Sequence, residues 1–548
     1  MLITMRRYIL STSLALGLGT ASWLTAATLD INNATTAEIQ AAYAKGLTAE
    51  KVVAAYLARI DAYEKKGPAI NSIITLNTKA LAEAKALDAE LKAKGPRSPL
   101  HGIPVLLKDN VDTFDLPTTG GSQLLEGSIP PDDAFITKKL REAGAIIIAK
   151  VNLSEWAGSG GSTSGAPADI AKAGRVPNGF SSAGGQTLNP HDLTRGPSGS
   201  SGGTGAALAA SFGHVGIGTD TGGSVRGPSS ANGIAGLKPT RGLLSRDGII
   251  PLGLSYDTAG PMARTVYDVA ASLGTMTGID AADSATFPSG GHYHHDYTQF
   301  LKTGSLKGAR IGVARDFLGQ DPEVDRIIAQ TIKTLQSLGA VIVDPVSYPE
   351  YLRRARQDIY NVVVRAEFKA DLTTYLKTTK PGFPKSFDDV VRLSNDPATK
   401  YRSPGKAVGL KWGAPSDVSF DLTDPVYLAT KNQILPSVTA VFEALFAKHQ
   451  LDAIIYPTSP RPAQPINPPD PAPAPMDSPT SFANFTGWPD VIVPAGMTKD
   501  GLPVTVSFFG RAWTEPKLLA YAYDFEQATK ARVLPVTTPA LKSDLITY

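Results

Sequence analysis

The chain has 548 residues, of which 42% are hydrophobic and 19% charged, and its formal net charge is +3. This composition is typical of a globular protein with a large buried core and excludes a disordered chain. The nearly balanced charge, with no basic run that carries interleaved aromatic residues, gives no indication of nucleic-acid binding. The sequence contains no cysteine, which excludes disulfide bonds, thiolate zinc sites and a cysteine nucleophile.

The first 27 residues have the pattern of a secretory signal. Arg6 and Arg7 precede an apolar run over residues 8–24, and the small residues Thr25-Ala-Ala27 follow it. A basic, then apolar, then small-residue order is typical of a signal peptide. We therefore expect an exported protein, periplasmic or secreted, that is free of the membrane once the signal is cleaved. An uncleaved anchor is the alternative, because the run is near the lower length limit for a spanning helix.

Helices and short apolar strands alternate along the rest of the chain. Hydrophobic periodicity predicts helices that begin at capping residues, and strands rich in β-branched residues. The expected helices cover 36–45, 49–65, 78–94, 133–143, 204–211 and 515–528, the expected strands cover 145–149, 212–218 and 504–508, and helix–strand units cover 322–343 and 438–456. A further apolar strand ends on Lys108. This alternation predicts an α/β fold in which helices cover both faces of a sheet.

Two irregular stretches interrupt this order. Residues 159–182 are rich in glycine and serine, and residues 457–479 are dense in proline with alanine and aspartate. A proline-rich stretch is stiff and extended. Long loops in compact domains are often functional, although proline-rich spacers are at least as common. No stretch has the pattern of a linker between independent domains.

Residues 196–226 hold the candidate chemistry. Ser200 and Ser224 lie among glycines at the two ends of this stretch, and the residues between them predict a short helix and a buried strand. Glycines permit backbone angles closed to other residues and leave N–H groups bare enough to surround a negative charge. A flexible linker is the alternative. A linker has no reason to enclose an apolar helix and strand or to carry Asp220 and Arg226 at its far end, so we expect a folded segment.

Lys108 is the candidate base. It directly follows the apolar run Val105-Leu-Leu107, so its stem is expected to be buried at a strand end. Burial lowers the pKa of a lysine and can leave a neutral amine that acts as a base. The alternative is a surface lysine whose stem covers apolar neighbours.

Two other patterns are weaker candidates. His292 and His294 form a His-x-His pair, which can bind a metal, but they follow glycines in a polar loop instead of ending an apolar strand. Ser201 is at the centre of a Gly-x-Ser-x-Gly motif, the nucleophile elbow of α/β-hydrolases. That elbow needs a strand directly before it, and the preceding residues are polar with two prolines.

Taken together, these residues resemble the amidase signature family, serine hydrolases with a Ser–cis-Ser–Lys triad. The resemblance extends over roughly residues 39–532. The motifs that carry it are Leu106-Leu-Lys-Asp-Asn110, Gly199-Ser-Ser-Gly-Gly203, Gly218-Thr-Asp-Thr-Gly-Gly-Ser-Val-Arg226, Gly236-Leu-Lys-Pro-Thr240 and Asp257-Thr-Ala-Gly-Pro-Met262. The stretches that look like bacterial peptide amidases, which deamidate the C-terminal amide of peptides, are Asn152-Leu-Ser-Glu-Trp-Ala157, Gly184-Gly-Gln-Thr-Leu-Asn-Pro190, Ser245-Arg-Asp-Gly-Ile-Ile-Pro251 and Trp513-Thr-Glu-Pro-Lys517.

The resemblance implies a role for each site residue. Ser224 would be the nucleophile that forms the acyl-enzyme, Lys108 the base, and Ser200, after a cis peptide bond, the proton relay between them. The backbone N–H groups expected in the oxyanion hole are those of Thr221, Gly222, Gly223 and Ser224. The residues expected to support the site are Ser201, Asp220 and Arg226. The resemblance implies no metal and no cofactor.

It also implies an α/β/α fold around a central mixed sheet. The signal would cover residues 1–27, and a single amidase domain would cover 28–548. Within that domain, 28–95 would form N-terminal helices, 96–310 the catalytic core and 311–548 the remainder of the fold.

The function implied is that of an exported amidohydrolase that cleaves linear amides, small molecules or peptides, with peptide C-terminal amides as one candidate. Aryl amides, esters and carbamates stay open, because the same acyl chemistry serves them, and because residues 159–179 form a longer insertion than peptide amidases lead us to expect. A periplasmic solute-binding protein would bind without turnover and would not need Lys108 and both serines. A tRNA-dependent amidotransferase subunit shares the signature but works in the cytoplasm with a partner, which the export signal disfavours.

Overall fold

The computed structural model describes residues 27–158, 176–355, 359–413, 421–467 and 478–548. The expected signal lies outside the described residues except for Ala27, and so do residues 159–175 and 468–477 of the two irregular stretches. Among the described residues, no helix has the length and apolar character needed to cross a membrane.

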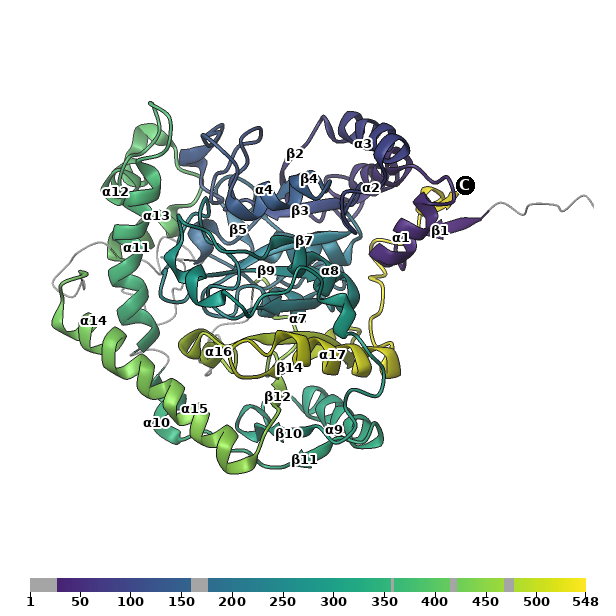
Figure 1. Ribbon diagram of the computed structural model, residues 1–548. Coiled ribbons are helices and arrows are strands. Elements are labelled where there is room, and N and C mark those ends of the chain that lie inside the picture. The colour runs from purple at the N-terminus through teal and green to yellow at the C-terminus, as the bar shows by residue number, and fades with distance from the viewer. Residues whose placement is uncertain (1–26, 159–175, 356–358, 414–420, 468–477) are drawn as a thin grey trace, which may run out of the picture.

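One mixed sheet of 11 strands forms the centre of the fold, as expected (Figure 1). In spatial order its strands are β11 (Val341–Val343), β10 (Arg310–Val313), β12 (Ala453–Pro457), β14 (Pro503–Phe509), β13 (Asp490–Met497), β8 (Ala235–Lys238), β9 (Thr258–Ala263), β7 (Val215–Asp220), β3 (Pro104–Lys108), β4 (Ile146–Val151) and β2 (Ile73–Leu76). The pairs β11–β10, β10–β12, β7–β3 and β3–β4 are parallel, and the other neighbours are antiparallel. Two small sheets pair β1 (Thr28–Asp30) with β15 (Leu545–Thr547) and β5 (Phe180–Ser181) with β6 (Gly185–Gln186).

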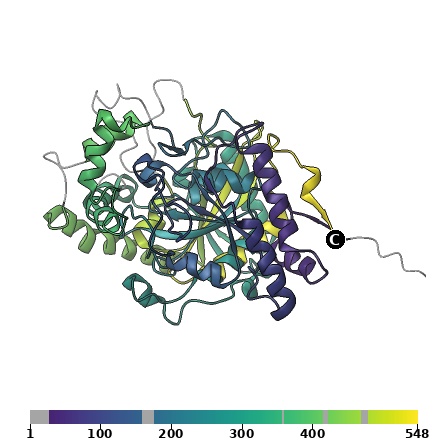
Figure 2. The same ribbon diagram turned by 90° about the horizontal axis from the view of Figure 1, so that it is seen from above.

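Helices flank this sheet, and those that the sequence predicted begin and end close to the predicted positions (Figures 1 and 2). The helices along the first part of the chain are α1 (Thr36–Tyr43), α2 (Ala49–Tyr63), α3 (Ala80–Lys94), α4 (Phe135–Glu142), α6 (Gly202–Ala209), α7 (Arg226–Ala231) and α8 (Val266–Met276). Helix α2 begins as predicted at Thr48, whose hydroxyl accepts the N–H of Lys51 at 3.3 Å. Helix α3 ends at Gly95, which has φ 81°.

The second part of the chain carries α9 (Pro322–Ser337), α10 (Glu350–Ala355), α11 (Asn361–Leu376), α12 (Phe387–Asn395), α13 (Pro404–Gly413), α14 (Pro425–Ala429), α15 (Leu435–His449), α16 (Ser481–Thr486) and α17 (Glu515–Thr529). The helices that were not expected are α7, α8, α10 to α14 and α16. Figures 1 and 2 show α11 to α14 grouped beyond one end of the strands, on the opposite side from β1 and the C-terminus.

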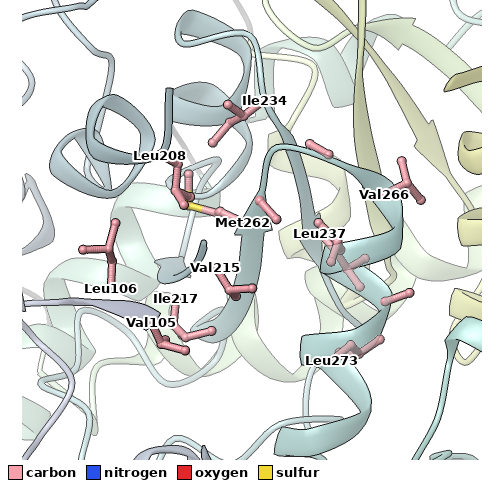
Figure 3. Packing of buried hydrophobic residues seen from close by; sticks show 14 of the residues in the cluster. Val105, Leu106, Leu208, Val215, Ile217, Ile234, Leu237, Met262, Val266 and Leu273 are labelled. Atoms are coloured by element: carbon pink, nitrogen blue, oxygen red, sulfur yellow. The ribbon is translucent and has the colours of Figure 1, made fainter. Parts of the chain in front are cut away.

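The core around α6 depends on small residues. The backbone N–H of Gly203 donates to the carbonyl of Asn152 at 3.0 Å, and a Cβ at Gly203 would lie 2.3 Å from that oxygen. The glycine therefore lets α6 lie directly against the backbone of Asn152. Figure 3 shows the packing beside it, where Leu208 of α6 lies next to Met262 of β9.

The strand that follows α6 begins later than predicted, at Val215 instead of residue 212. Ser211 has φ 57°, and the N–H of Phe212 donates back to the carbonyl of Ala207 at 2.8 Å. These residues therefore form the turn that ends the helix.

Candidate active site

Lys108 lies where two neighbouring parallel strands of the sheet reach their carboxyl ends. It is the last residue of β3, whose parallel neighbour β7 ends at Asp220. Its side chain is fully buried, and its Nζ donates to the hydroxyl of Thr219 at 2.7 Å and to that of Ser200 at 2.8 Å. The structure thus brings together the lysine and the first of the two expected serines.

The ammonium form of Lys108 is disfavoured at this position. Burial lowers the pKa of Lys108 to about 7, and the nearby carboxylates of Asp220 and Asp257 offset only part of that shift. A buried amine with this pKa exchanges a proton easily near neutral pH, as a general base must. The alternative of a surface lysine with a buried stem is wrong.

Ser200 lies in a loop that its neighbours fix on both sides. The peptide bond between Gly199 and Ser200 is cis, as the family resemblance implied. The carbonyl of Ser200 accepts the N–H of Ser154 at 2.9 Å. A Cβ at Gly199 would lie 2.4 Å from the Ser154 hydroxyl, so glycine is required there. Ser201 lies between this loop and α6, and its hydroxyl donates to the carbonyl of Thr219 at 3.2 Å.

Ser201 therefore has a supporting place in the structure. It is fully buried, and a loop instead of a strand precedes it, so the nucleophile-elbow alternative fails on its context.

Ser224 is half-buried and joins the serine loop through its backbone. Its carbonyl accepts the N–H of Ser201 at 3.1 Å. Between the described residues, no hydrogen bond joins the hydroxyls of Ser224 and Ser200. The second serine is thus held beside the serine loop by this backbone hydrogen bond.

The loop before Ser224 offers backbone donors, with one change from the expectation. The N–H of Gly223 donates to Asp220 Oδ1 at 2.8 Å, so it is not free to bind an oxyanion. In the described part of the chain, the N–H groups of Thr221, Gly222 and Ser224 have no such partner. These three are the donors left for a negative charge that develops beside Ser224.

Asp220 and Arg226 form a buried ion pair that holds this loop. Arg226 donates to both carboxylate oxygens of Asp220, at 2.9 and 3.1 Å, and the same carboxylate accepts the N–H of Val225 at 2.9 Å. Burial by itself raises the pKa of Asp220, but the Arg226 guanidinium outweighs it and holds the pKa below its ordinary value. The carboxylate is therefore ionised and fixes the turn that carries the nucleophile candidate.

The second half of this network was not predicted from the sequence. Arg226 also donates to Asp490 on β13 at 2.9 Å, to Asn484 on α16 at 2.5 Å and to the carbonyl of Thr480 at 2.6 Å. Tyr456 completes it by donating to Asp490 at 2.5 Å. These partners lie more than two hundred residues from Arg226 along the chain, and no local motif marks them.

Thr219 and Asn110 were also missed as site residues. The Thr219 hydroxyl accepts from Lys108 and, at 3.1 Å, from the Asn110 side chain. Their signal was present, because Asn110 lies in the same motif as Lys108 and Thr219 is the penultimate residue of the strand that leads to Asp220.

The histidine pair packs against aromatic rings. His292 stacks on Trp513 with ring centroids 4.9 Å apart, and His294 lies edge-on to Tyr297 and Phe300. Among the described residues, no group of three or more histidine or carboxylate side chains is placed to hold a metal ion.

The chain is similar to known proteins along most of its length. The family model described as Amidase matches residues 51–519. The chain is 33% identical over 543 residues to a probable amidase of Arabidopsis thaliana, with 96% of each chain covered. It is 37% identical over 499 residues to a glutamyl-tRNA(Gln) amidotransferase subunit of Thermoanaerobacter pseudethanolicus, with 89% of this chain and 95% of that one covered.

A solved structure is similar as well. The X-ray structure of the native peptide amidase from Stenotrophomonas maltophilia superposes with a TM-score of 0.80 at 38% sequence identity, covering 92% of this chain and 98% of that chain. The family match and the structural match thus each cover most of the chain. This chain therefore belongs to the amidase family, whose members hydrolyse C–N amide bonds.

Proposed function

We propose that this amidase works through an acyl-enzyme on Ser224, with Ser200 and Lys108 as its proton relay. The observation that carries the proposal is the 2.8 Å hydrogen bond from the fully buried Lys108 amine to Ser200, together with a lysine pKa of about 7. A neutral amine accepts a proton, and a buried hydroxyl between it and Ser224 passes that proton on.

In the first half-reaction the Ser224 hydroxyl gives its proton to Ser200, which gives its own to Lys108. The Ser224 oxygen attacks the amide carbon, and the carbonyl electron pair moves onto the oxygen. The N–H groups of Thr221, Gly222 and Ser224 stabilise that charge. When the tetrahedral intermediate collapses, the C–N bond breaks, and the leaving amine takes the proton back from Lys108 through Ser200.

In the second half-reaction water replaces the amine. Lys108 takes a proton from the water through Ser200, and the hydroxide attacks the acyl carbon. The bond to Ser224 breaks, the carboxylic acid leaves, and Ser224 recovers its proton. The protein's groups end as they began, so each turnover consumes one amide and one water.

We propose peptide C-terminal amides as the substrate. The support is the 38% identity to the peptide amidase from Stenotrophomonas maltophilia over 98% of that chain. Aryl amides, esters and carbamates are the alternatives, because they pass through the same acyl-enzyme. An amidotransferase subunit is a further candidate on the 37% identity to such a subunit. That function would require a partner chain for useful turnover, so hydrolysis by the isolated chain separates the two.

We also propose that the protein is exported and that the signal over residues 1–27 is removed. Cell fractionation and N-terminal sequencing of the mature chain test this directly. A mature protein in the periplasm or medium that begins near residue 28 supports it, and an intact Met1 on a cytoplasmic protein contradicts it.

The function is tested by ammonia release from peptide amides, free amino-acid amides and aryl amides. The wild type is measured beside Ser224→Ala and beside Ser337→Ala, an exposed serine on α9 that serves as the control. Turnover of peptide amides that is lost only in Ser224→Ala supports the proposal. Full activity of Ser224→Ala contradicts the mechanism, turnover confined to aryl or small amides contradicts the substrate class, and folded wild type without any turnover favours a binding protein.

A further inference from the structure

An aromatic ring closes one side of the oxyanion loop. A Cβ at Gly222 would lie 2.9 Å from Cε2, 3.0 Å from Cζ and 3.1 Å from the hydroxyl oxygen of Tyr360. The ring edge of Tyr360 therefore lies directly against the backbone of a proposed oxyanion donor. Tyr360 directly precedes α11, without a capping hydrogen bond from its side chain, and is half-buried.

One buried ring stacks on Tyr360, and a second packs against the first. Tyr256 stacks on it with centroids 5.6 Å apart and an angle of 14° between the ring planes, and Phe485 of α16 lies 5.8 Å from Tyr256. Tyr256 is 1% exposed and Phe485 5% exposed. We call these three rings the aromatic wall. Only its front member, Tyr360, is partly open to solvent, so that ring is the one a ligand can touch.

The residues on either side of Tyr256 connect the aromatic wall to the nucleophile loop and to α11. Asp257, next to Tyr256, accepts the hydroxyl of Thr221 at 2.5 Å. Ser255, on its other side, donates from its N–H to Glu367 of α11 at 2.8 Å. One short segment thus fixes α11 against the oxyanion loop, and a side chain that is held on two sides forms a defined contact surface.

A small cavity also borders this loop. The cavity that Thr219, Thr221 and Asp257 line has a volume of about 10 Å³. A volume of this size holds about one water molecule. It admits no amino-acid side chain, so a bulky substituent on the substrate carbonyl has to lie elsewhere.

We propose that Tyr360 is the substrate-binding residue that selects the terminal side chain of a peptide amide, and that it favours aromatic and large apolar residues over glycine. The inference rests on the proposed hydrolysis of peptide amides. In that reaction the leaving group is ammonia, so the only bulky group next to the carbonyl is the terminal residue of the acyl part. The carbonyl oxygen bound at the N–H of Gly222 brings that residue into van der Waals range of the Tyr360 ring.

The test compares kcat/KM for N-acetylphenylalanine amide and N-acetylglycine amide. We expect the wild type to favour the phenylalanine amide by about tenfold or more, the gain available from a side chain in an apolar subsite. Tyr360→Ala should reduce this ratio to about one by slowing the phenylalanine amide alone, whereas Tyr360→Phe should keep it, because the ring and not the hydroxyl makes the contact. Tyr375→Phe, on the same helix but bonded to Asp112 at 2.7 Å, is the control and should leave the ratio unchanged.

Tyr360→Leu covers the case in which Tyr360→Ala does not fold, because leucine keeps apolar bulk but removes the ring. An equal loss on both amides in Tyr360→Ala or Tyr360→Leu, or a wild-type ratio near one, overturns the inference and leaves the hydrolase intact. Calorimetric binding of the two amides to Ser224→Ala, with and without Tyr360→Leu, needs no turnover. If the wild type hydrolyses nothing but this binding preference depends on Tyr360, the proposed function fails, whereas the contact of Tyr360 with the terminal side chain is supported. If binding shows no preference, the inference fails.

Discussion

The two halves of the sheet contribute to the site in different ways. The half that contains β3 and β7 carries Lys108 and lies beside both serines, so every group proposed to react comes from a stretch with local motifs. The half that begins at β13 supplies no proposed reacting group. It supplies Asp490, and α16 adds Asn484, which together hold Arg226 beneath the nucleophile loop. The residues proposed to react thus lie in local motifs, whereas some of the residues that hold the nucleophile loop in place lie far from it in the sequence.

The largest expected difference is between two buried lysines, one beside the serines and one that joins the two halves of the sheet. Lys108 and Lys238 are both fully buried, and burial lowers the pKa of each to about 7. Within the described part of the chain, Lys238 donates only to the carbonyls of Pro239 and Trp488, so it joins β8 to the far half without reaching a serine. We expect Lys108→Met to lower kcat by about 10²- to 10⁴-fold, while folded Lys238→Met keeps the wild-type kcat. Steady-state kinetics with circular dichroism check this, and equal losses in both variants would contradict the assignment of Lys108.

Removing Arg226 should break the link between the two halves. Arg226→Met leaves the buried carboxylates of Asp220 and Asp490 without their counter-charge, which costs about 3–5 kcal/mol of the unfolding free energy. Urea unfolding measures the loss. Arg326→Met is the control, because its pair with Glu323 lies on the surface, and it should unfold like the wild type. An Arg226 variant as stable as the wild type would show that the network does not hold the fold.

The pH dependence of the reaction separates Lys108 from Lys238. Because Lys108 acts as a base with a pKa of about 7, kcat/KM should fall about tenfold per pH unit below that value and level off above it. Folded Lys238→Met should show the same profile. A profile that is flat from pH 5 to 8 would contradict the role of Lys108.

The buried amine of Lys108 should also make the free energy of unfolding depend on pH. The pKa of Lys108 is about 7 in the folded chain, and an unfolded lysine has a pKa of about 10.4. Between these two pKa values the unfolded chain binds more protons than the folded chain. The free energy of unfolding therefore rises as pH rises through this window, and this gain disappears as pH falls toward 7. Lys108→Met should show a smaller rise than the wild type in urea unfolding at pH 7 and pH 9. An identical rise would contradict the pKa assigned to the buried amine.

Much of the fold was predictable because its signals are local. The hydroxyl of Thr48 caps α2 and Gly95 ends α3, and both were visible as start and stop residues. Helices α10 to α14 were missed although some signals were present. Ser386 caps α12 with Asp389, and Asp424 precedes Pro425 at the start of α14.

The site was predictable only as far as its motifs extend. Lys108 follows an apolar run and the two serines lie among glycines, and these local patterns marked all three as candidates. The N–H of Gly223 was expected in the oxyanion hole, but the structure gives it to Asp220, because the Asp220 side chain turns back on its own loop. The stacking of Tyr256 on Tyr360 joins residues about a hundred positions apart, and no pattern in either segment indicates it.

The acyl-enzyme is the most direct test of the central claim. An ester of N-acetylphenylalanine with p-nitrophenol has a leaving group that departs quickly, so the acyl form should accumulate. Mass spectrometry of the quenched, digested protein then locates the acyl group. We predict N-acetylphenylalanyl on the peptide that contains Ser224, attached to that residue and absent from Ser224→Ala. An acyl group on Ser200 or Ser201, or unchanged acylation of Ser224→Ala, would contradict the account.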